Sequence, residues 1–157
     1  MSAKYKFTDK EAVYFVTATV VDWVDVFTRN IYRNILLDSL RFCQKNQGLQ
    51  IHAWVLMPNH LYMICSFINE REPGLVLKNI KSFTAINIID AVINNKQESR
   101  KEWMLEIFEK NGKANKSNYR FQFWQHENHS ILLDTPEKYK QRINYLDENP
   151  GRAGFCL

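Results

Sequence analysis

Two strand-like segments separated by only two residues constrain the fold of this chain more than any other feature. Residues 50–57 (QIHAWVLM) and 60–67 (HLYMICSF) are rich in aromatic and β-branched side chains, which is typical of β-strands. Pro58 and Asn59 lie between them, and both residue types favour turns. Because so short a connection joins antiparallel neighbours, these segments predict a β-hairpin.

The chain before the hairpin predicts one strand and one helix. Residues 12–22 (AVYFVTATVVD) resemble a buried strand. Apolar residues at helical spacing predict a helix over about 30–46, with Thr28 as the expected N-terminal cap. Gly48 stands just after this helix, where a left-handed residue is expected to end it.

The chain after the hairpin predicts mainly helices. Apolar spacing indicates a long helix over about 75–94 and a shorter one over about 99–109, followed by a basic loop at 110–119. Residues 121–133 return to strand-like composition, with an expected break at His-Glu-Asn-His. Thr135, Pro136 and Glu137 are typical of a helix start, and that helix should run to about 147.

This element order favours an α+β class, with helices packed on one face of a ferredoxin-like antiparallel sheet. We expect residues 1–157 to form a single domain, since the 157 residues match the size of one core and show no internal boundary. Apolar residues make up 45% of the chain, but no run approaches the ~20 residues of a membrane span.

Cysteine content and the N-terminal segment predict a cytoplasmic protein without a membrane partner. The three cysteines are far apart and in no metal-binding pattern, so we expect reduced, mostly buried thiols. The N-terminal segment has no apolar core of a signal peptide. The net charge is +4, and residues 96–120 carry seven lysines and arginines against four glutamates. A nucleic-acid ligand and a solvated surface both explain that distribution.

Two segments contain the candidate catalytic and metal-binding residues, and the first of them lies within the predicted hairpin. The first is Ala53-Trp54-Val55-Leu56-Met57-Pro58-Asn59-His60-Leu61-Tyr62, and the second is Tyr145-Leu146-Asp147-Glu148-Asn149-Pro150-Gly151-Arg152-Ala153-Gly154. Together they resemble the signatures A-W-V-x-M-P-N-H-x-H and Y-I-x-x-N-P-x-x-A-G of the REP-associated tyrosine transposases and their insertion-sequence relatives, the single-tyrosine HUH transposases. The resemblance extends from the first strand to Phe155.

Elementary geometry explains why these residue types could act together. His60 and Tyr62 are two apart in a strand, so they project to the same face. Tyr145 and Asn149 are four apart in a helix and lie one turn apart. If the last helix packs against the hairpin, an imidazole, an amide oxygen and a phenol converge, and such a site could hold Mg²⁺ or Mn²⁺ together with a phosphodiester.

The resemblance implies a reaction. The metal would polarise a phosphate of single-stranded or hairpin DNA, and the Tyr145 hydroxyl would attack the phosphorus to give a 5′-phosphotyrosine link and a free 3′-hydroxyl. The bond energy stays in the covalent intermediate, so a later strand can be rejoined without ATP. Lys78, Lys81 and Arg142 are candidate phosphate contacts, although a solvated face explains them equally well.

Tyr62 departs from the family pattern, which has a second metal-binding histidine there. A neutral phenol is a poor ligand for a hard cation. Three possibilities stay open. The metal binds more weakly through His60, Asn149, water and phosphate; His126 or His129 supplies the missing ligand; or the protein has lost cleavage and only binds DNA. An RNA-binding module is a weaker alternative, and both a monomer and a homodimer are compatible with the sequence.

Overall fold

The computed structural model describes residues 7, 9–115, 120–127, 129–148 and 152–154. Five strands form one sheet in the order β4-β1-β3-β2-β5, and every neighbouring pair is antiparallel. The strands are β1 (Tyr14–Thr19), β2 (Leu49–Leu56), β3 (His60–Phe67), β4 (Ile131–Leu132) and β5 (Arg152–Gly154). The first four follow the ferredoxin-like arrangement, so the predicted α+β class is confirmed.

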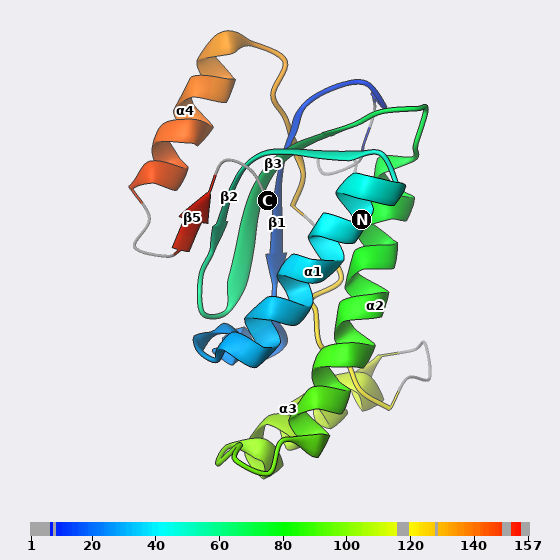
Figure 1. Cartoon of the computed structure of the whole chain (residues 1–157), viewed down its shortest axis with the longest axis vertical. Coiled ribbons are helices and arrows are strands. Elements are labelled where there is room, and N and C mark those ends of the chain that lie inside the picture. Colours follow the sequence, from blue (N-terminus) through cyan, green and yellow to red (C-terminus); the bar gives the residue numbers. More distant parts are fainter. Residues whose placement is uncertain (1–6, 8, 116–119, 128, 149–151, 155–157) are drawn as a thin grey trace.

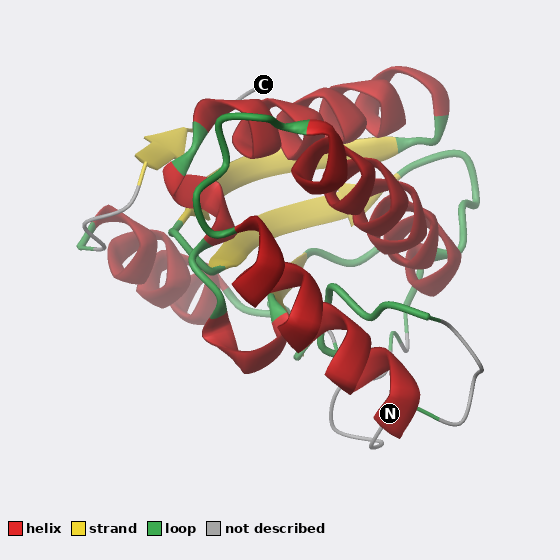
Figure 2. Ribbon diagram, turned by 90° about the horizontal axis from the view of Figure 1, so that it is seen from below, coloured by secondary structure: helices red, strands yellow, loops and turns green. Residues whose placement is uncertain are grey.

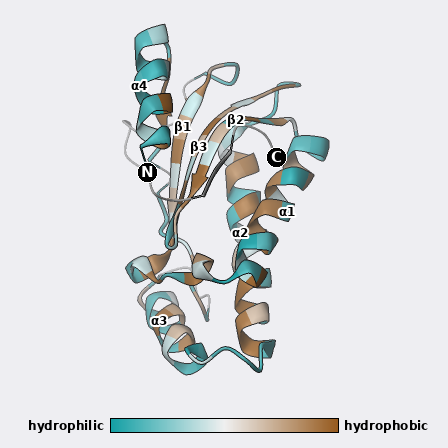
Figure 3. Cartoon of the chain, turned by 60° about the vertical axis from the view of Figure 1, so that its left-hand side comes forward, coloured by the Kyte–Doolittle hydropathy of each residue, from teal (hydrophilic) through white to brown (hydrophobic). Residues whose placement is uncertain are grey.

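Two helices cover one face of this sheet and one covers the other. Helices α1 (Asn30–Asn46) and α2 (Pro73–Asn94) pack on the larger apolar core, whereas α4 (Pro136–Asp147) packs on a smaller one. Figure 3 shows the sheet between α4 and the α1–α2 pair, and Figure 2 shows the strands in yellow between helices. The prediction that all helices pack on one face is therefore wrong for α4. The apolar stripe of this helix is buried against the opposite face of the sheet.

Helix α3 (Lys101–Ala114) continues beyond α2 at the lower end of the molecule (Figure 1). It runs five residues past the predicted end, so residues 110–114 are helical rather than a loop. Tertiary packing explains the extension: Gly112 lies directly against the backbone of Arg120 and Phe121, where no larger residue would fit. The rest of the predicted loop is described only at Asn115, and residues 116–119 lie outside the described part.

Two local predictions at the ends of α1 had different outcomes. Thr28 does not cap α1: it ends a short 3₁₀ helix (Val26–Thr28), where its hydroxyl donates to the Asp25 carbonyl at 3.0 Å. Arg29 precedes α1 without a side-chain cap. Gly48 does take a left-handed conformation, with φ of 72°, and a Cβ there would lie 2.7 Å from the Ile68 carbonyl oxygen. That prediction is confirmed.

Strand-like composition at 121–133 yields little regular strand. Trp124 forms one isolated bridge with Val20, and β4 has two residues. Cys43 and Cys65 are buried and free, as predicted, while Cys156 lies outside the described residues. Within the described part of the chain, no helix is both long enough and apolar enough to cross a membrane.

Candidate active site

The hairpin that begins the site turns where the sequence predicts it. The Met57 N–H donates to the His60 carbonyl at 2.8 Å, which leaves Pro58 and Asn59 as the two turn residues. The carbonyls of both turn residues accept further bonds, Pro58 from the Phe27 N–H at 2.8 Å and Asn59 from the Val20 N–H at 3.0 Å. The turn is thus fixed to the neighbouring segment, and the start of β3 has a defined position.

Helix α4 brings its side chains onto the hairpin because of its cap and its apolar stripe. The Thr135 hydroxyl accepts from the Lys138 N–H at 3.2 Å, and Pro136 occupies the first turn, both as predicted. Tyr139, Ile143 and Leu146 recur at spacings of four and three and contact the apolar cluster that contains Phe15, Val55 and Ile64. The last turn of α4, which carries Tyr145, therefore lies against the sheet.

Four aromatic rings meet on this face. The Tyr145 and Tyr62 hydroxyls are hydrogen-bonded at 3.1 Å, and their ring centroids are 5.4 Å apart. The Tyr62 ring lies edge-on to His60, with centroids 4.6 Å apart, and stacks on Phe15 at 5.5 Å. The sequence prediction that Tyr145 and the hairpin residues share one location is met within a single chain.

Asn59 orients the His60 ring. The Asn59 side-chain nitrogen donates to the Trp23 carbonyl at 3.3 Å, so the amide oxygen is directed toward His60 Nδ1, with which it makes a short hydrogen bond. Since an amide oxygen only accepts, Nδ1 carries the ring proton and Nε2 keeps its lone pair. Burial lowers the pKa of His60, so the ring is neutral at neutral pH.

Tyr62 is held in its neutral form. Two causes raise the pKa of Tyr62 to about 12: burial is the larger, and the hydrogen bond with Tyr145 is the next. An ionised phenolate at this position is therefore disfavoured near neutral pH. The Tyr62 hydroxyl is available as a hydrogen-bond partner of Tyr145 rather than as an anionic ligand.

The three residues predicted to contact phosphate do not lie together. Arg142 belongs to the cluster: its guanidinium carbon is 4.8 Å from the Phe15 ring centroid and 5.9 Å from that of Tyr145. Lys78 is exposed on α2, the helix that covers the opposite face. Lys81 is half-buried, and its ammonium donates to the Gln125 and Glu127 carbonyls at 2.8 and 3.4 Å. The loop thus accepts two of the three N–H donors of Lys81, and a phosphate contact of this residue stays a prediction.

A divalent cation does not fit the described side chains on their own. Asn149, the third predicted ligand, lies outside the described residues. His60 offers one suitable nitrogen, but Tyr62 is a neutral phenol, and the described residues contain no group of three or more histidines, cysteines or carboxylates that could hold a metal. His126 and His129 lie in the segment before β4 and belong to no such group either.

Sequence reasoning missed two contributors to this site. Phe15 was assigned only to a buried strand, yet it forms the floor under Tyr62 and Arg142. The alternation of β1 could have indicated its face, because Tyr14 and Val16 point to the larger core while Phe15 points to the smaller one. Asn59 was assigned only to the turn, and nothing in its type predicts that it orients His60.

Comparison with known proteins supports the fold. No protein-family model matches the sequence, and no curated protein matches it. A REP-associated tyrosine transposase, solved bound to a REP hairpin, matches with a TM-score of 0.64 at 14% identity over 96% of this chain and 73% of that chain. The fold is HUH transposase-like. A proposed transposase of Deinococcus radiodurans R1 matches with a TM-score of 0.53 at 16% identity, over 96% of this chain and 98% of that chain. At such low identity the likeness concerns the fold.

Proposed function

We propose that this chain is a transposase that nicks and rejoins single-stranded or hairpin DNA, with Tyr145 as the nucleophile. The observation that carries the proposal is the Tyr145 hydroxyl of α4 meeting Tyr62 at 3.1 Å, beside His60, in the same chain. A second support is the HUH transposase-like fold, shared with a tyrosine transposase that was solved with a DNA hairpin.

The proposed step is an exchange of one phosphoester for another. The Tyr145 oxygen forms a bond to the phosphorus and loses its proton, while the bond from phosphorus to the 3′ oxygen breaks and that oxygen becomes a hydroxyl. The fragment on the 3′ side of the cut stays on the enzyme, joined through its 5′ phosphate to Tyr145, and attack by a 3′ hydroxyl in the reverse step rejoins a strand. Tyr145 is 41% exposed, which leaves its hydroxyl accessible to a DNA backbone.

Arg142 fits this proposal as a phosphate contact. Its guanidinium lies over Phe15 and near Tyr145, so a phosphate placed for attack would meet a positive charge. The need for Mg²⁺ or Mn²⁺ stays a prediction, since the described ligands do not build a metal site by themselves. A test for a covalent protein–DNA adduct should therefore include both metals and a chelator.

The experiment is a search for a covalent protein–DNA adduct. The purified chain is incubated with end-labelled hairpin DNA and Mn²⁺, Mg²⁺ or chelator, and the products are separated under denaturing conditions. A labelled band at the mass of the protein plus DNA should form with the wild type and be lost in Tyr145→Phe. The matched control is Tyr139→Phe, a change of the same chemistry at a tyrosine six residues earlier in α4, which should keep the adduct.

A catalytically degenerate DNA-binding protein is the second candidate, and Tyr62 is the observation that favours it. The position resembles that of a metal-binding histidine, yet the pKa of this phenol is raised to about 12. The variant Tyr62→His separates the two functions. If the wild type forms no adduct, binds hairpin DNA and gains adduct formation only as Tyr62→His with Mn²⁺, the degenerate function is correct.

A further inference from the structure

The segment between β1 and α1 presents one tryptophan to solvent. Val20, Val21 and Val24 are each at most 2% exposed, so the chain on both sides of Asp22 and Trp23 is anchored in the larger core. Trp23, in contrast, is 66% exposed, more than any other large hydrophobic residue in the described part of the chain. A large aromatic side chain is therefore exposed on a segment that is itself fixed.

The backbone holds Trp23 in an unfavourable conformation. Asp22 and Trp23 both lie in the left-handed region, with φ of 51° and 53°. Aspartate adopts this region fairly readily, but a bulky side chain seldom does. Two hydrogen bonds maintain the turn: the Trp23 N–H donates to the Val20 carbonyl at 3.1 Å, and the Asp22 carboxylate accepts from the Asn111 side chain at 3.3 Å. Strained residues of this kind cluster at binding and active sites.

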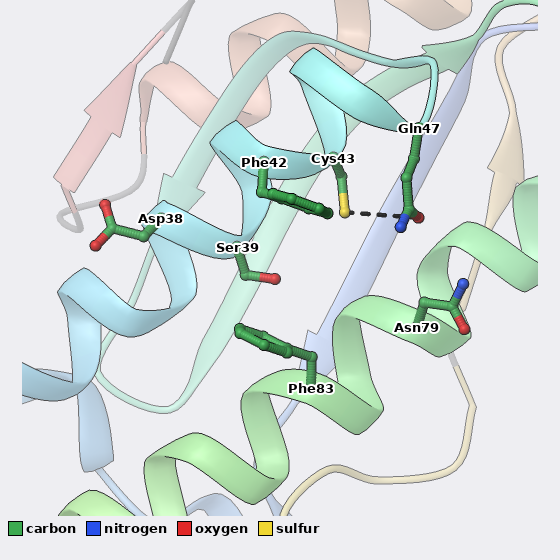
Figure 4. A pocket seen from close by; sticks show the side chains of 7 residues that line it. All are labelled: Asp38, Ser39, Phe42, Cys43, Gln47, Asn79 and Phe83. Carbon is green, nitrogen blue, oxygen red and sulfur yellow. Dashed lines mark hydrogen bonds between the residues drawn. The ribbon is translucent and has the colours of Figure 1, made fainter.

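Two other exposed aromatic rings differ from Trp23 in both backbone and position. Phe42 and Phe83 stand on the regular helices α1 and α2, on the two walls of a groove (Figure 4), so their exposure requires no strained backbone. Both helices pack on the face of the sheet opposite to the α4 face, which carries Tyr145. These two rings therefore give no reason to expect a contact with DNA at the candidate active site.

Trp23 is connected to the candidate active site through Asn59. The Trp23 carbonyl accepts from the Asn59 side-chain nitrogen, and the oxygen of the same amide accepts from His60 Nδ1. A single amide group thus separates the Trp23 backbone from the imidazole. Figure 1 shows this segment, in blue, beside the β2–β3 turn at the lower end of the sheet. A DNA strand with a phosphate at His60 and Tyr145 therefore has a neighbouring nucleotide close to Trp23.

The charge next to Trp23 favours a base over a phosphate. Asp22 is exposed, and its carboxylate repels the DNA backbone but not a neutral base. The indole is a flat surface on which a base can stack, and such stacking supports the binding of single strands with little dependence on sequence. Because the segment is already fixed, little conformational entropy is lost when a base binds.

We propose that Trp23 is a stacking platform for an unpaired base next to the phosphate that Tyr145 attacks. The inference rests on the proposed function and adds a base-binding position to it. The ligand is a base in the single-stranded flank of a DNA hairpin, because a base inside the stem must first be unpaired and unstacked. Trp23 contributes affinity and holds the strand in place, while the attack on phosphorus stays with Tyr145.

Fluorescence anisotropy with a labelled hairpin that carries single-stranded flanks tests the contact. All proteins carry Tyr145→Phe, so that binding is measured without a covalent adduct. Trp23→Ala should raise the dissociation constant about 5-fold or more, whereas Trp23→Phe, which keeps a ring, should raise it by less. The salt dependence should not change, because no phosphate contact is lost. The matched control Phe42→Ala removes an exposed ring from the opposite side and should leave the dissociation constant unchanged.

Abasic nucleotides identify the base that stacks. One position of the flank at a time is made abasic, and each DNA is measured with Trp23 and with Trp23→Ala. At one position, loss of the base should weaken binding about 5-fold with Trp23 and have little effect with Trp23→Ala, because both changes remove the same contact. Equal losses with both proteins at every position, or a reduced salt dependence in Trp23→Ala, overturn the proposal.

Thermal unfolding of Trp23→Gly separates binding from folding. Glycine removes the ring and adopts the left-handed backbone without strain, so the Tm should stay equal or rise while DNA affinity falls as in Trp23→Ala. A lower Tm would assign Trp23 to the fold and overturn the proposal. If no protein binds the hairpin, the proposed function fails as well. If all proteins bind it equally, only the Trp23 contact fails.

Discussion

The face of the sheet under α1 and α2 and the face under α4 differ in how completely they exclude water. Val16, Met63 and Cys65 on the first face are all at most 2% exposed, and they belong to a continuous apolar core. On the second face Phe15 and Ile64 are buried, but Tyr62 and His60 are only half-buried. Tyr145 above them remains 41% exposed.

This difference separates stability from chemistry. The α1–α2 face holds closely packed apolar groups, whose burial is the main favourable contribution to folding. The α4 face holds hydroxyls, an imidazole and a guanidinium near water, and perturbed titrating groups in such a position are candidates for function. Changes on the first face should therefore alter the free energy of unfolding, and changes on the second should alter reactions with DNA.

The largest expected change in stability comes from the first face. Leu40 is fully buried, so Leu40→Ala should lower the free energy of unfolding by about 2–5 kcal/mol through lost transfer energy and a cavity. Tyr145→Phe should lower it by less than about 1 kcal/mol, because only a partly exposed hydroxyl is lost. Urea unfolding measures both, and equal losses would contradict the separation.

A buried carboxylate near α1 gives the next largest effect. Glu98 accepts from Arg29 at 2.9 Å and from Tyr32 at 3.0 Å. Burial alone would raise the pKa of Glu98, but these bonds and the Arg100 N–H lower it overall. Glu98→Gln should lower the free energy of unfolding by about 2–4 kcal/mol at pH 7. The loss is at the low end of what breaking a buried ion pair costs, because the guanidinium partners are partly exposed.

The sign of the pH dependence follows from the lowered pKa of Glu98. Glu98 binds a proton less readily in the folded protein than in the unfolded chain. Its contribution to stability is therefore complete above the pKa of the unfolded state and is lost as the pH falls through the pKa of the folded state. The difference in the free energy of unfolding between wild type and Glu98→Gln should therefore narrow below about pH 4.5, the ordinary pKa of a glutamate. Urea titrations at pH 7 and pH 4 measure this difference, and a difference that widens in acid would refute the assignment.

Two exposed or half-exposed cations on opposite faces sharpen the comparison for DNA. Arg142→Ala should weaken binding of hairpin DNA by about 3–10-fold and lower the salt slope by about one, since one phosphate contact is lost. Lys78→Ala removes the same charge from the α2 side and should change affinity by less than about 2-fold. Fluorescence anisotropy at two salt concentrations measures the affinity of both variants. A larger loss in Lys78→Ala than in Arg142→Ala would place the DNA on the α2 side and contradict the account.

The smallest expected effect concerns the Tyr62 hydroxyl. Tyr62→Phe keeps the stacking on Phe15 and removes only the bond to Tyr145. The free energy of unfolding should fall by no more than about 1 kcal/mol, and DNA affinity should stay unchanged. Thermal unfolding and anisotropy check both, and a loss above 2 kcal/mol would show that this bond supports the fold of the α4 face.

The sequence was sufficient where local chemistry decides the structure. The Pro58-Asn59 turn, the Thr135 cap and the left-handed Gly48 follow from residue type and neighbours, and all three are present. Alternation in β3 was enough to expect His60 and Tyr62 on one face, whereas the expectation that Tyr145 lies beside them came from the family resemblance.

The sequence was insufficient where distant segments decide it. The second sheet face under α4, the extension of α3 and the loop contacts of Lys81 each depend on packing between segments far apart in the chain. Phe15 as the floor of the site belongs to the same group. Periodicity shows that a face is apolar, but it does not show which element will cover that face.

The central claim is that Tyr145 becomes joined to DNA, and mass spectrometry of the digested adduct tests it most directly. Trypsin should release residues 143–152, a peptide whose only tyrosine is Tyr145. The account predicts that this peptide carries the mass of a 5′-phosphorylated nucleotide after nuclease treatment. A nucleotide on any other peptide, or no adduct with either Mg²⁺ or Mn²⁺, would contradict it.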